Sequence, residues 1–289
     1  MKQLGFSEKV RGFSLLEFLT AGVLGAAVLA AAGTAYWQAR KLTVAADGRV
    51  SAQHLRFRLA EAVRRDFAQA GRFGCAALSD KSVSVSGGSG VTDFSDGLGK
   101  PGFAGIRQLA VADLGLNGFT AESPVLLAVY GSGAVAPERI IRTADGGLAA
   151  VVLPERNDFE RGELLAVSDC ATVVQTENTA SAHDKTLHLP AWRGKVQADA
   201  LRVMRVTAAA YVWGRPYGAE QSGLYRFERG AHDWGEPWLL AEAGGFQTAF
   251  AYCRSGKWFF TPRPEADGLP AWLMLNGAAA AVEGGRQCA

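Results

Sequence analysis

Residues 13–37 form an apolar run that carries a single formal charge, the carboxylate of Glu17. As an α-helix rising 1.5 Å per residue, this run would be roughly 37 Å long, which exceeds the bilayer hydrocarbon core of about 30 Å. A carboxylate inside such a span is costly, about 2.5–3.5 kcal/mol at the bilayer centre. We therefore expect Glu17 to meet a positive partner. A cut between Gly12 and Phe13 would supply one, the α-amine of Phe13, four residues away.

The residues at the start of this run, 11–17 (Arg-Gly-Phe-Ser-Leu-Leu-Glu), resemble the class III signal of type IV pilins and type II secretion pseudopilins. The resemblance implies a leader peptide at 1–12, which a prepilin peptidase of the inner membrane removes by cutting after Gly12. The same peptidase would N-methylate Phe13, and Glu17 would guide subunit docking during assembly. An ordinary signal-anchor with an accidental carboxylate is the alternative. A cleaved secretory signal is disfavoured, because its apolar region spans only about 7–15 residues.

Formal charge gives no reason to expect a nucleic-acid partner. The chain has 30 Lys and Arg against 28 Asp and Glu, and the leader holds three of the basic and one of the acidic residues, so residues 13–289 carry 27 of each. The charges flanking the apolar run are also balanced, so the positive-inside rule does not orient it. The pilin resemblance supplies the orientation. It implies a single-pass helix at 13–37 in the bacterial inner membrane, with the leader inside and the rest of the chain in the periplasm.

Beyond the span, residues 38–72 are predicted to continue the helix as an amphipathic segment. Gly71 and Gly74 mark its predicted end, and Asp47-Gly48 is its predicted weak joint. Apolar residues recur every four positions on one face: Leu55, Leu59, Val63 and Phe67. Charged residues lie around this stripe, and we expect them on a solvated or subunit-facing side rather than on a DNA-binding one: Arg56, Arg58, Arg64, Arg65 and Asp66.

From residue 73 to 289 the pattern changes to short β-type runs separated by Gly, Asp and Pro clusters. A long helix followed by such runs predicts an α+β fold, in which the amphipathic helix face covers one side of a mostly antiparallel sheet. Residues 80–105, rich in Gly and Ser, are predicted to form a long loop or insertion. The predicted strands are Ile106–Val111, Val125–Tyr130, Leu148–Leu153, Leu164–Val167, Thr172–Gln175, Leu201–Val206, Ala210–Trp213, Leu224–Phe227, Phe246–Tyr252 and Trp258–Phe260.

The chain has four cysteines, and all of them lie beyond the apolar run. In an oxidising periplasm they are expected to form disulfides, with three possible pairings. Cys75 ends the helical region, and Cys170 follows an apolar strand that could lie against that end. Cys288 lies next to the last residue and needs an anchor, for which Cys253 at the end of a strand is the natural choice. We therefore predict the pairs Cys75–Cys170 and Cys253–Cys288.

Three segments of the body, residues 70–75, 162–171 and 223–227, resemble signatures of the PilW/PilJ group of minor pilins. With the N-terminus, the resemblance implies the type IV pilin fold and a low-abundance subunit at the pilus tip. Such a subunit joins other minor pilins and the major pilin, primes assembly, and has a tip adhesin as a further partner. A type II secretion pseudopilin of the J type is one alternative. A membrane-anchored periplasmic enzyme or binding protein, which uses the span only as an anchor, is another.

No enzymatic activity, cofactor or metal is predicted. The cysteines lack zinc-ligand spacing, and His183, Asp184 and His188 are interpreted as a polar loop that leads into a short strand. Six tryptophans of the body are assigned to the core and to subunit contacts rather than to a sugar site: Trp192, Trp213, Trp234, Trp238, Trp258 and Trp272.

Overall fold

The computed structural model describes residues 14–80, 82–87, 105–109, 114, 116, 118–180, 184–190, 192, 195–230, 233–242, 244–265, 269–282 and 288. The predicted leader, the cleavage site at Gly12 and the methylation site at Phe13 lie outside these residues. The chain divides into two compact units, Met1–His54 and Leu55–Ala289. The last turns of the long helix therefore belong to the same unit as the β-sheets.

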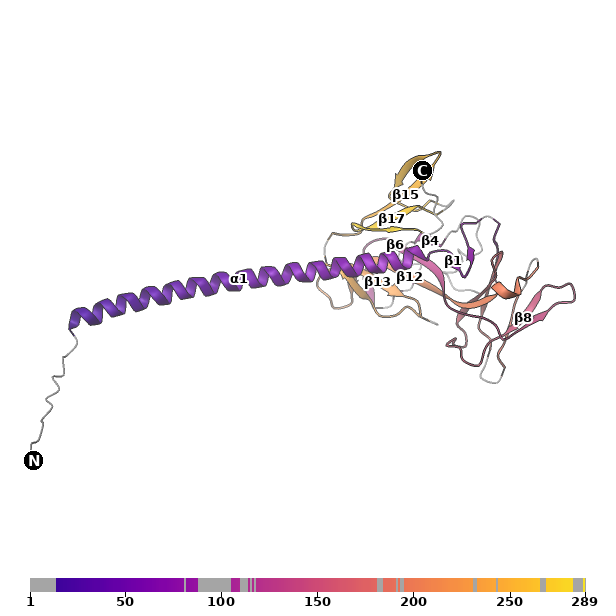
Figure 1. Ribbon diagram of the computed structural model, residues 1–289, viewed down its shortest axis with the longest axis horizontal. Helices are drawn as coiled ribbons and strands as arrows, with labels where there is room; N and C mark the ends of the chain where they lie inside the picture. The colour runs from indigo at the N-terminus through magenta and orange to yellow at the C-terminus, as the bar shows by residue number, and fades with distance from the viewer. Residues whose placement is uncertain are drawn as a thin grey trace, which may run out of the picture. The chain divides into compact units, whose positions relative to one another are not determined.

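The long helix α1 extends over Leu15–Ala68, 54 residues, and is drawn in indigo in Figure 1. It contains no proline and is continuous through Asp47 and Gly48, so the helix does not break at the predicted weak joint. A single glycine costs a helix only about 1 kcal/mol relative to alanine, and the residues on both sides are helix formers. Every described residue of α1 before Leu55 is exposed.

Within the second unit, the end of α1 presents its apolar stripe to the core. Leu59, Val63 and Phe67 are buried, which confirms the predicted four-residue repeat. The chain leaves the helix through Gly71, whose φ of 76° suits glycine. Asp66, which was expected on the solvated side, is instead fully buried. That prediction was wrong. The Asp66 carboxylate can be buried because residues far along the chain, Tyr130, Tyr211 and Arg226, donate hydrogen bonds to it.

A nine-stranded sheet forms the centre of the body. Six of its strands follow the order β14-β13-β12-β9-β10-β3; β5 and β6 also pair with β12, and β4 pairs with β6. Its pairs are antiparallel except β3 with β10. The strands are β3 (Ser84–Gly87), β4 (Ile106–Leu109), β5 (Phe119–Ala121), β6 (Val125–Val135), β9 (Leu164–Ser168), β10 (Thr172–Glu177), β12 (Arg202–Pro216), β13 (Gly223–Glu228) and β14 (Trp238–Ala241).

Two predictions for this sheet need correction. The separate runs Leu201–Val206 and Ala210–Trp213 are one strand, β12, because the small residues between them continue the pairing with β6. The segment 80–105 is not wholly a loop, since β3 lies inside it and pairs in parallel with β10. Residues 88–104 of that segment lie outside the described part of the chain.

The described residues of the body also form three smaller sheets. A two-stranded sheet follows α1, a three-stranded sheet has the order β11-β8-β7, and a C-terminal sheet has the order β16-β15-β17-β18. Their strands are β1 (Arg72–Phe73), β2 (Ala76–Ala77), β7 (Arg139–Arg142), β8 (Leu148–Val152), β11 (Thr186–His188), β15 (Thr248–Arg254), β16 (Lys257–Thr261), β17 (Trp272–Leu275) and β18 (Ala278–Ala281); η2 (Ala198–Ala200) is a short 3-10 helix.

The end of α1 packs between the central sheet and the C-terminal sheet, as Figure 1 shows around β12, β13, β15 and β17. Val63 and Phe67 share one buried cluster with Tyr211 of β12 and with Phe250 and Leu273 of the C-terminal sheet. The Phe67 and Tyr211 ring centroids are 5.3 Å apart. Each such side chain contributes about 1.5–3 kcal/mol when fully buried. The fold is therefore α+β, with a helix covering a largely antiparallel sheet.

Candidate functional site: the two ends of the N-terminal helix

The start of α1 is closed by a reciprocal pair of hydrogen bonds between Ser14 and Glu17. The Ser14 backbone N–H donates to Glu17 Oε2 over 3.1 Å, and the Glu17 N–H donates to Ser14 Oγ over 3.2 Å. This arrangement is a capping box, which satisfies two otherwise unpaired N–H groups of the first turn. The Ser-x-x-Glu spacing of residues 14–17 is the sequence signal of this box, whereas Glu17 was assigned from the sequence only to subunit docking. The predicted partner of Glu17, the α-amine of Phe13, lies outside the described residues.

The first part of α1 has the length and composition of a membrane span. An 18-residue window reaches a mean hydropathy of 2.0, and none of it is buried. Large apolar side chains cover all sides of the helix here, with exposed fractions of 57–81%. A helix that is apolar all round requires lipid or other helices as its surroundings. The exposed residues include Leu15, Leu16, Phe18, Leu19, Val23, Leu24, Val28 and Leu29.

At the other end of α1, the Asp66 carboxylate is the centre of a buried polar cluster. Arg226 Nε donates to Asp66 Oδ2 over 2.6 Å, and Arg226 Nη2 donates to Oδ1 over 3.2 Å. Tyr211 Oη donates to Oδ2 over 2.7 Å, and Tyr130 Oη donates to Oδ1 over 3.2 Å. Arg65 Nε adds a bond of 3.0 Å from the helix itself. The donors Tyr130, Tyr211 and Arg226 come from β6, β12 and β13, which are adjacent strands.

Burial and charge keep the two tyrosines neutral and Arg226 protonated near neutral pH. Burial raises the pKa of Tyr211 and Tyr130, and the negative charge of Asp66 raises both further. Burial acts to lower the pKa of Arg226, but its hydrogen bonds and ion pair with Asp66 outweigh that effect and raise it. None of these three groups titrates near neutral pH. The cluster is therefore suited to holding the helix end on the sheet and unsuited to acid–base catalysis.

Two disulfides have the predicted pairing. Cys75 and Cys170 join the turn between β1 and β2 to the turn after β9, with a Cα–Cα distance of 4.8 Å and a sequence separation of 95. Cys253 and Cys288 have a Cα–Cα distance of 5.2 Å and a separation of 35. The first bond fastens the segment just after α1 to the central sheet, and the second fastens residue 288 to β15.

Removing a disulfide should destabilise the body, and by somewhat more where the loop that it closes is longer. By chain entropy, a loop of about 100 residues is worth roughly 4.7 kcal/mol and a loop of about 15 residues roughly 3 kcal/mol. We therefore expect the pair of substitutions Cys75→Ala and Cys170→Ala to lower the free energy of unfolding by about 4 kcal/mol, and Cys253→Ala with Cys288→Ala by slightly less. Urea unfolding in detergent micelles measures both. A non-reduced peptide linking Cys75 to Cys253 would contradict the pairing.

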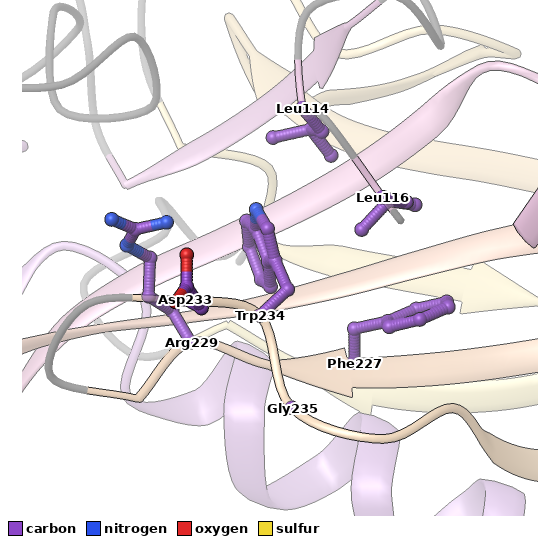
Figure 2. Close-up of a pocket in the computed structure, with 7 residues that line it drawn as sticks. All are labelled: Leu114, Leu116, Phe227, Arg229, Asp233, Trp234 and Gly235. Atoms are coloured by element: carbon purple, nitrogen blue, oxygen red, sulfur yellow. The ribbon is translucent and has the colours of Figure 1, made fainter. Parts of the chain in front are cut away.

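A small cavity lies on the side of the central sheet away from α1. It has a volume of about 130 Å³, which is below the range of about 300–1,000 Å³ typical of small-molecule sites. In Figure 2 the Arg229, Asp233 and Trp234 side chains reach toward it, and the Arg229 guanidinium carbon lies 6.0 Å from the centre of a Trp234 ring. Burial lowers the pKa of Arg229. The cavity is lined by Leu114, Leu116, Phe227, Arg229, Asp233, Trp234 and Gly235.

Within the described part of the chain, no cluster of three or more His, Cys, Asp or Glu side chains could hold a metal ion. Asp184 accepts a hydrogen bond from the Thr186 backbone, and His188 is exposed on β11. His183 lies outside the described residues.

Comparison of the chain with protein-family models, with curated proteins and with solved structures finds no match.

Proposed function

We propose that this protein is a minor pilin of the PilW/PilJ type, a subunit that joins other minor pilins to prime type IV pilus assembly and sits at the pilus tip. The observation that carries the proposal is α1 itself. It begins at the Ser14–Glu17 cap, directly behind the Arg-Gly-Phe signal, and continues unbroken to Ala68. Its first part is an exposed apolar span and its last part packs into the body.

The length of the helix favours an assembly role over simple anchoring. A membrane anchor needs about 20 apolar residues, whereas α1 extends over about 80 Å at 1.5 Å per residue. Its exposed middle part, residues 38–54, combines small and apolar residues with three cations, Arg40, Lys41 and Arg49. Such a surface suits packing among the helices of other subunits. A protein that used the span only as an anchor would not need the part of α1 beyond the apolar residues.

The partners and location follow from the same proposal. Prepilin peptidase cuts after Gly12 and methylates Phe13, the single helix resides in the inner membrane, and the disulfide-bonded body faces the periplasm. Assembly moves the subunit into the pilus, beside other minor pilins, the major pilin and a tip adhesin. The two disulfides support an oxidising location for the body.

Exchange of residues 1–37 for an unrelated membrane anchor tests the proposal. An assembly subunit should lose its function, measured as pilus number per cell, because the exchange removes the signal, Glu17 and the helix surface together. A matched exchange that keeps residues 1–20 and replaces only 21–37 with a leucine-rich span separates signal from surface. Normal piliation with the fully exchanged anchor would contradict the proposal, and would favour an anchored enzyme or binding protein. Normal piliation with impaired type II secretion would favour a pseudopilin.

A further inference from the structure

Four side chains at the end of the apolar run of α1 form an aromatic and cationic patch. Tyr36 and Trp37 are 66% and 63% exposed, and Arg40 and Lys41 follow them by four residues. Residues three and four apart are neighbours on a helix surface, so these four positions lie together on one side of α1. The Lys41 Nζ atom is 5.3 Å from the centre of a Trp37 ring, which is a cation–π contact. We call these four residues the boundary patch.

The helix directly before the boundary patch is suited to lipid in its polar groups as well as in its composition. Residues 18–35 carry no charged side chain. The two threonines of this run satisfy their hydroxyls within the helix, since Thr20 Oγ1 donates to a backbone carbonyl over 3.0 Å and Thr34 Oγ1 does so over 2.8 Å. A polar group that is bonded internally does not need water, so neither threonine opposes burial of the run in a bilayer.

The distance between the boundary patch and the start of α1 equals the thickness of a bilayer core. Trp37 follows Glu17 by 20 residues, which is about 30 Å at 1.5 Å per residue. The hydrocarbon core is also about 30 Å thick. With Trp37 at one surface of the core, the capping box at Ser14 and Glu17 therefore lies at the other.

We propose that the boundary patch binds the headgroups of acidic phospholipids and thereby fixes the depth of α1 in the bilayer. Trp and Tyr concentrate at membrane surfaces because each has an apolar ring and a group that can hydrogen-bond. The Arg40 guanidinium pairs with a lipid phosphate through two parallel hydrogen bonds, and the Lys41 ammonium acts as a point charge beside it. The inference rests on the membrane span of the proposed function, but it does not use the role in pilus assembly.

The place of the boundary patch along the helix favours a lipid over a nucleic acid. Exposed aromatic rings beside cations also suit single-stranded nucleic acid, but a nucleic acid lies in water. The patch instead begins at the last residues of a run that is apolar all round and requires apolar surroundings. The patch is therefore continuous with the membrane-facing surface of α1.

A third cation, Arg49, lies on the same exposed part of α1 but beyond the reach of the headgroups. It follows Lys41 by eight residues, which is about 12 Å along the helix. This exceeds the Debye length of about 8 Å at physiological ionic strength. Attraction to lipid phosphates should therefore depend on Arg40 and Lys41 and not on Arg49.

Fluorescence quenching by brominated lipids tests the depth of Trp37. The full chain is reconstituted into vesicles of phosphatidylglycerol and phosphatidylcholine whose acyl chains carry bromine either near the headgroup or near the chain end. The other six tryptophans lie at residue 192 or later, so the difference between the wild type and Trp37→Phe isolates this residue. Bromine near the headgroup should quench Trp37 at least about twofold more than bromine near the chain end. Equal quenching, or stronger quenching by the deeper bromine, would overturn the proposal.

Selectivity for acidic lipid tests the two cations. The double variant Arg40→Gln, Lys41→Gln should lower the preference for phosphatidylglycerol over phosphatidylcholine at least roughly threefold, because each cation at the surface attracts acidic lipid. Electron spin resonance of spin-labelled lipids measures this preference from the fraction that the protein immobilises. Arg49→Gln is the matched control and should leave the preference unchanged. Exchanging the two cations, as Arg40→Lys with Lys41→Arg, keeps both charges and should retain most of it.

Flotation of the vesicles separates failure of the boundary patch from failure of the span. A wild-type chain that does not float with the vesicles would contradict the membrane span, and the lipid-binding patch with it. A wild type that floats without preferring phosphatidylglycerol, or a double variant that keeps the preference, overturns the lipid-binding role alone. An equal loss in Arg49→Gln overturns the assignment to the patch. Binding of a single-stranded oligonucleotide that only the double variant loses, without lipid preference, would assign the patch to nucleic acid instead.

Discussion

An Asp66→Ala variant should unfold with a free energy about 3–5 kcal/mol below that of the wild type, because removing one member of a buried ion pair leaves the other charge uncompensated. Arg226 is 3% exposed, and its other carboxylate partner, Glu228, has a half-exposed side chain. The Tyr130 and Tyr211 hydroxyls would lose their acceptor as well. Urea unfolding in detergent micelles, followed by tryptophan fluorescence, measures the loss.

Two further variants separate charge from packing. Glu61→Ala removes an exposed carboxylate in the same part of α1, whose contact with Arg64 is 3.9 Å long, and should change the free energy of unfolding by less than about 1 kcal/mol. The double variant Asp66→Leu, Arg226→Met should recover part of the loss, since an apolar pair can replace a buried ion pair at little cost. A double variant as unstable as Asp66→Ala would show that uncompensated charge is not the cause.

Under the proposed function, replacing Glu17 with alanine should abolish assembly while leaving processing intact. The variant should be cut after Gly12 and N-methylated at Phe13, as mass spectrometry of the mature N-terminus would report. Loss of a charge pair inside an apolar environment costs about 3–5 kcal/mol, which weakens subunit association by two orders of magnitude or more. Co-purification with the other minor pilins should therefore fall to background.

Ser14→Ala is the control for the capping box. It removes the acceptor for the Glu17 N–H but keeps the carboxylate, and should cost the helix only about 0.5–2 kcal/mol. If the Ser14→Ala variant still co-purifies with the other minor pilins, Glu17 acts chiefly through its charge. Equal losses in the two variants would instead assign the role of Glu17 to the local cap.

The features that the sequence predicted well are long or strongly patterned. The apolar run and the four-residue repeat through Leu59, Val63 and Phe67 are periodic signals over many turns, and both are present in α1. The cysteine pairs followed from a helix end and a strand end that had been placed correctly. The cleavage and methylation sites remain predictions.

The features that the sequence did not reveal depend on distant partners or on short segments. Asp66 was misplaced because carboxylates are usually solvated, and its main partner, Arg226, is 160 residues away. Strands such as β17 and β18 have four residues each, too few to show a period of two. Which side chains share a face of the C-terminal sheet depends on the register that aligns four such strands.

The position of the helix end between two sheets also constrains the order in which the molecule can be made. Residues of α1 leave the ribosome first, yet the strands that bury Val63 and Phe67 include β15 and β17, which are synthesised nearly two hundred residues later. Contacts of such sequence separation form slowly. Until then the apolar stripe lacks the partners that the C-terminal sheet provides, among them Phe250 and Leu273. The apolar stripe of the nascent chain therefore needs shielding, by a membrane or by a chaperone, before the body can close around it.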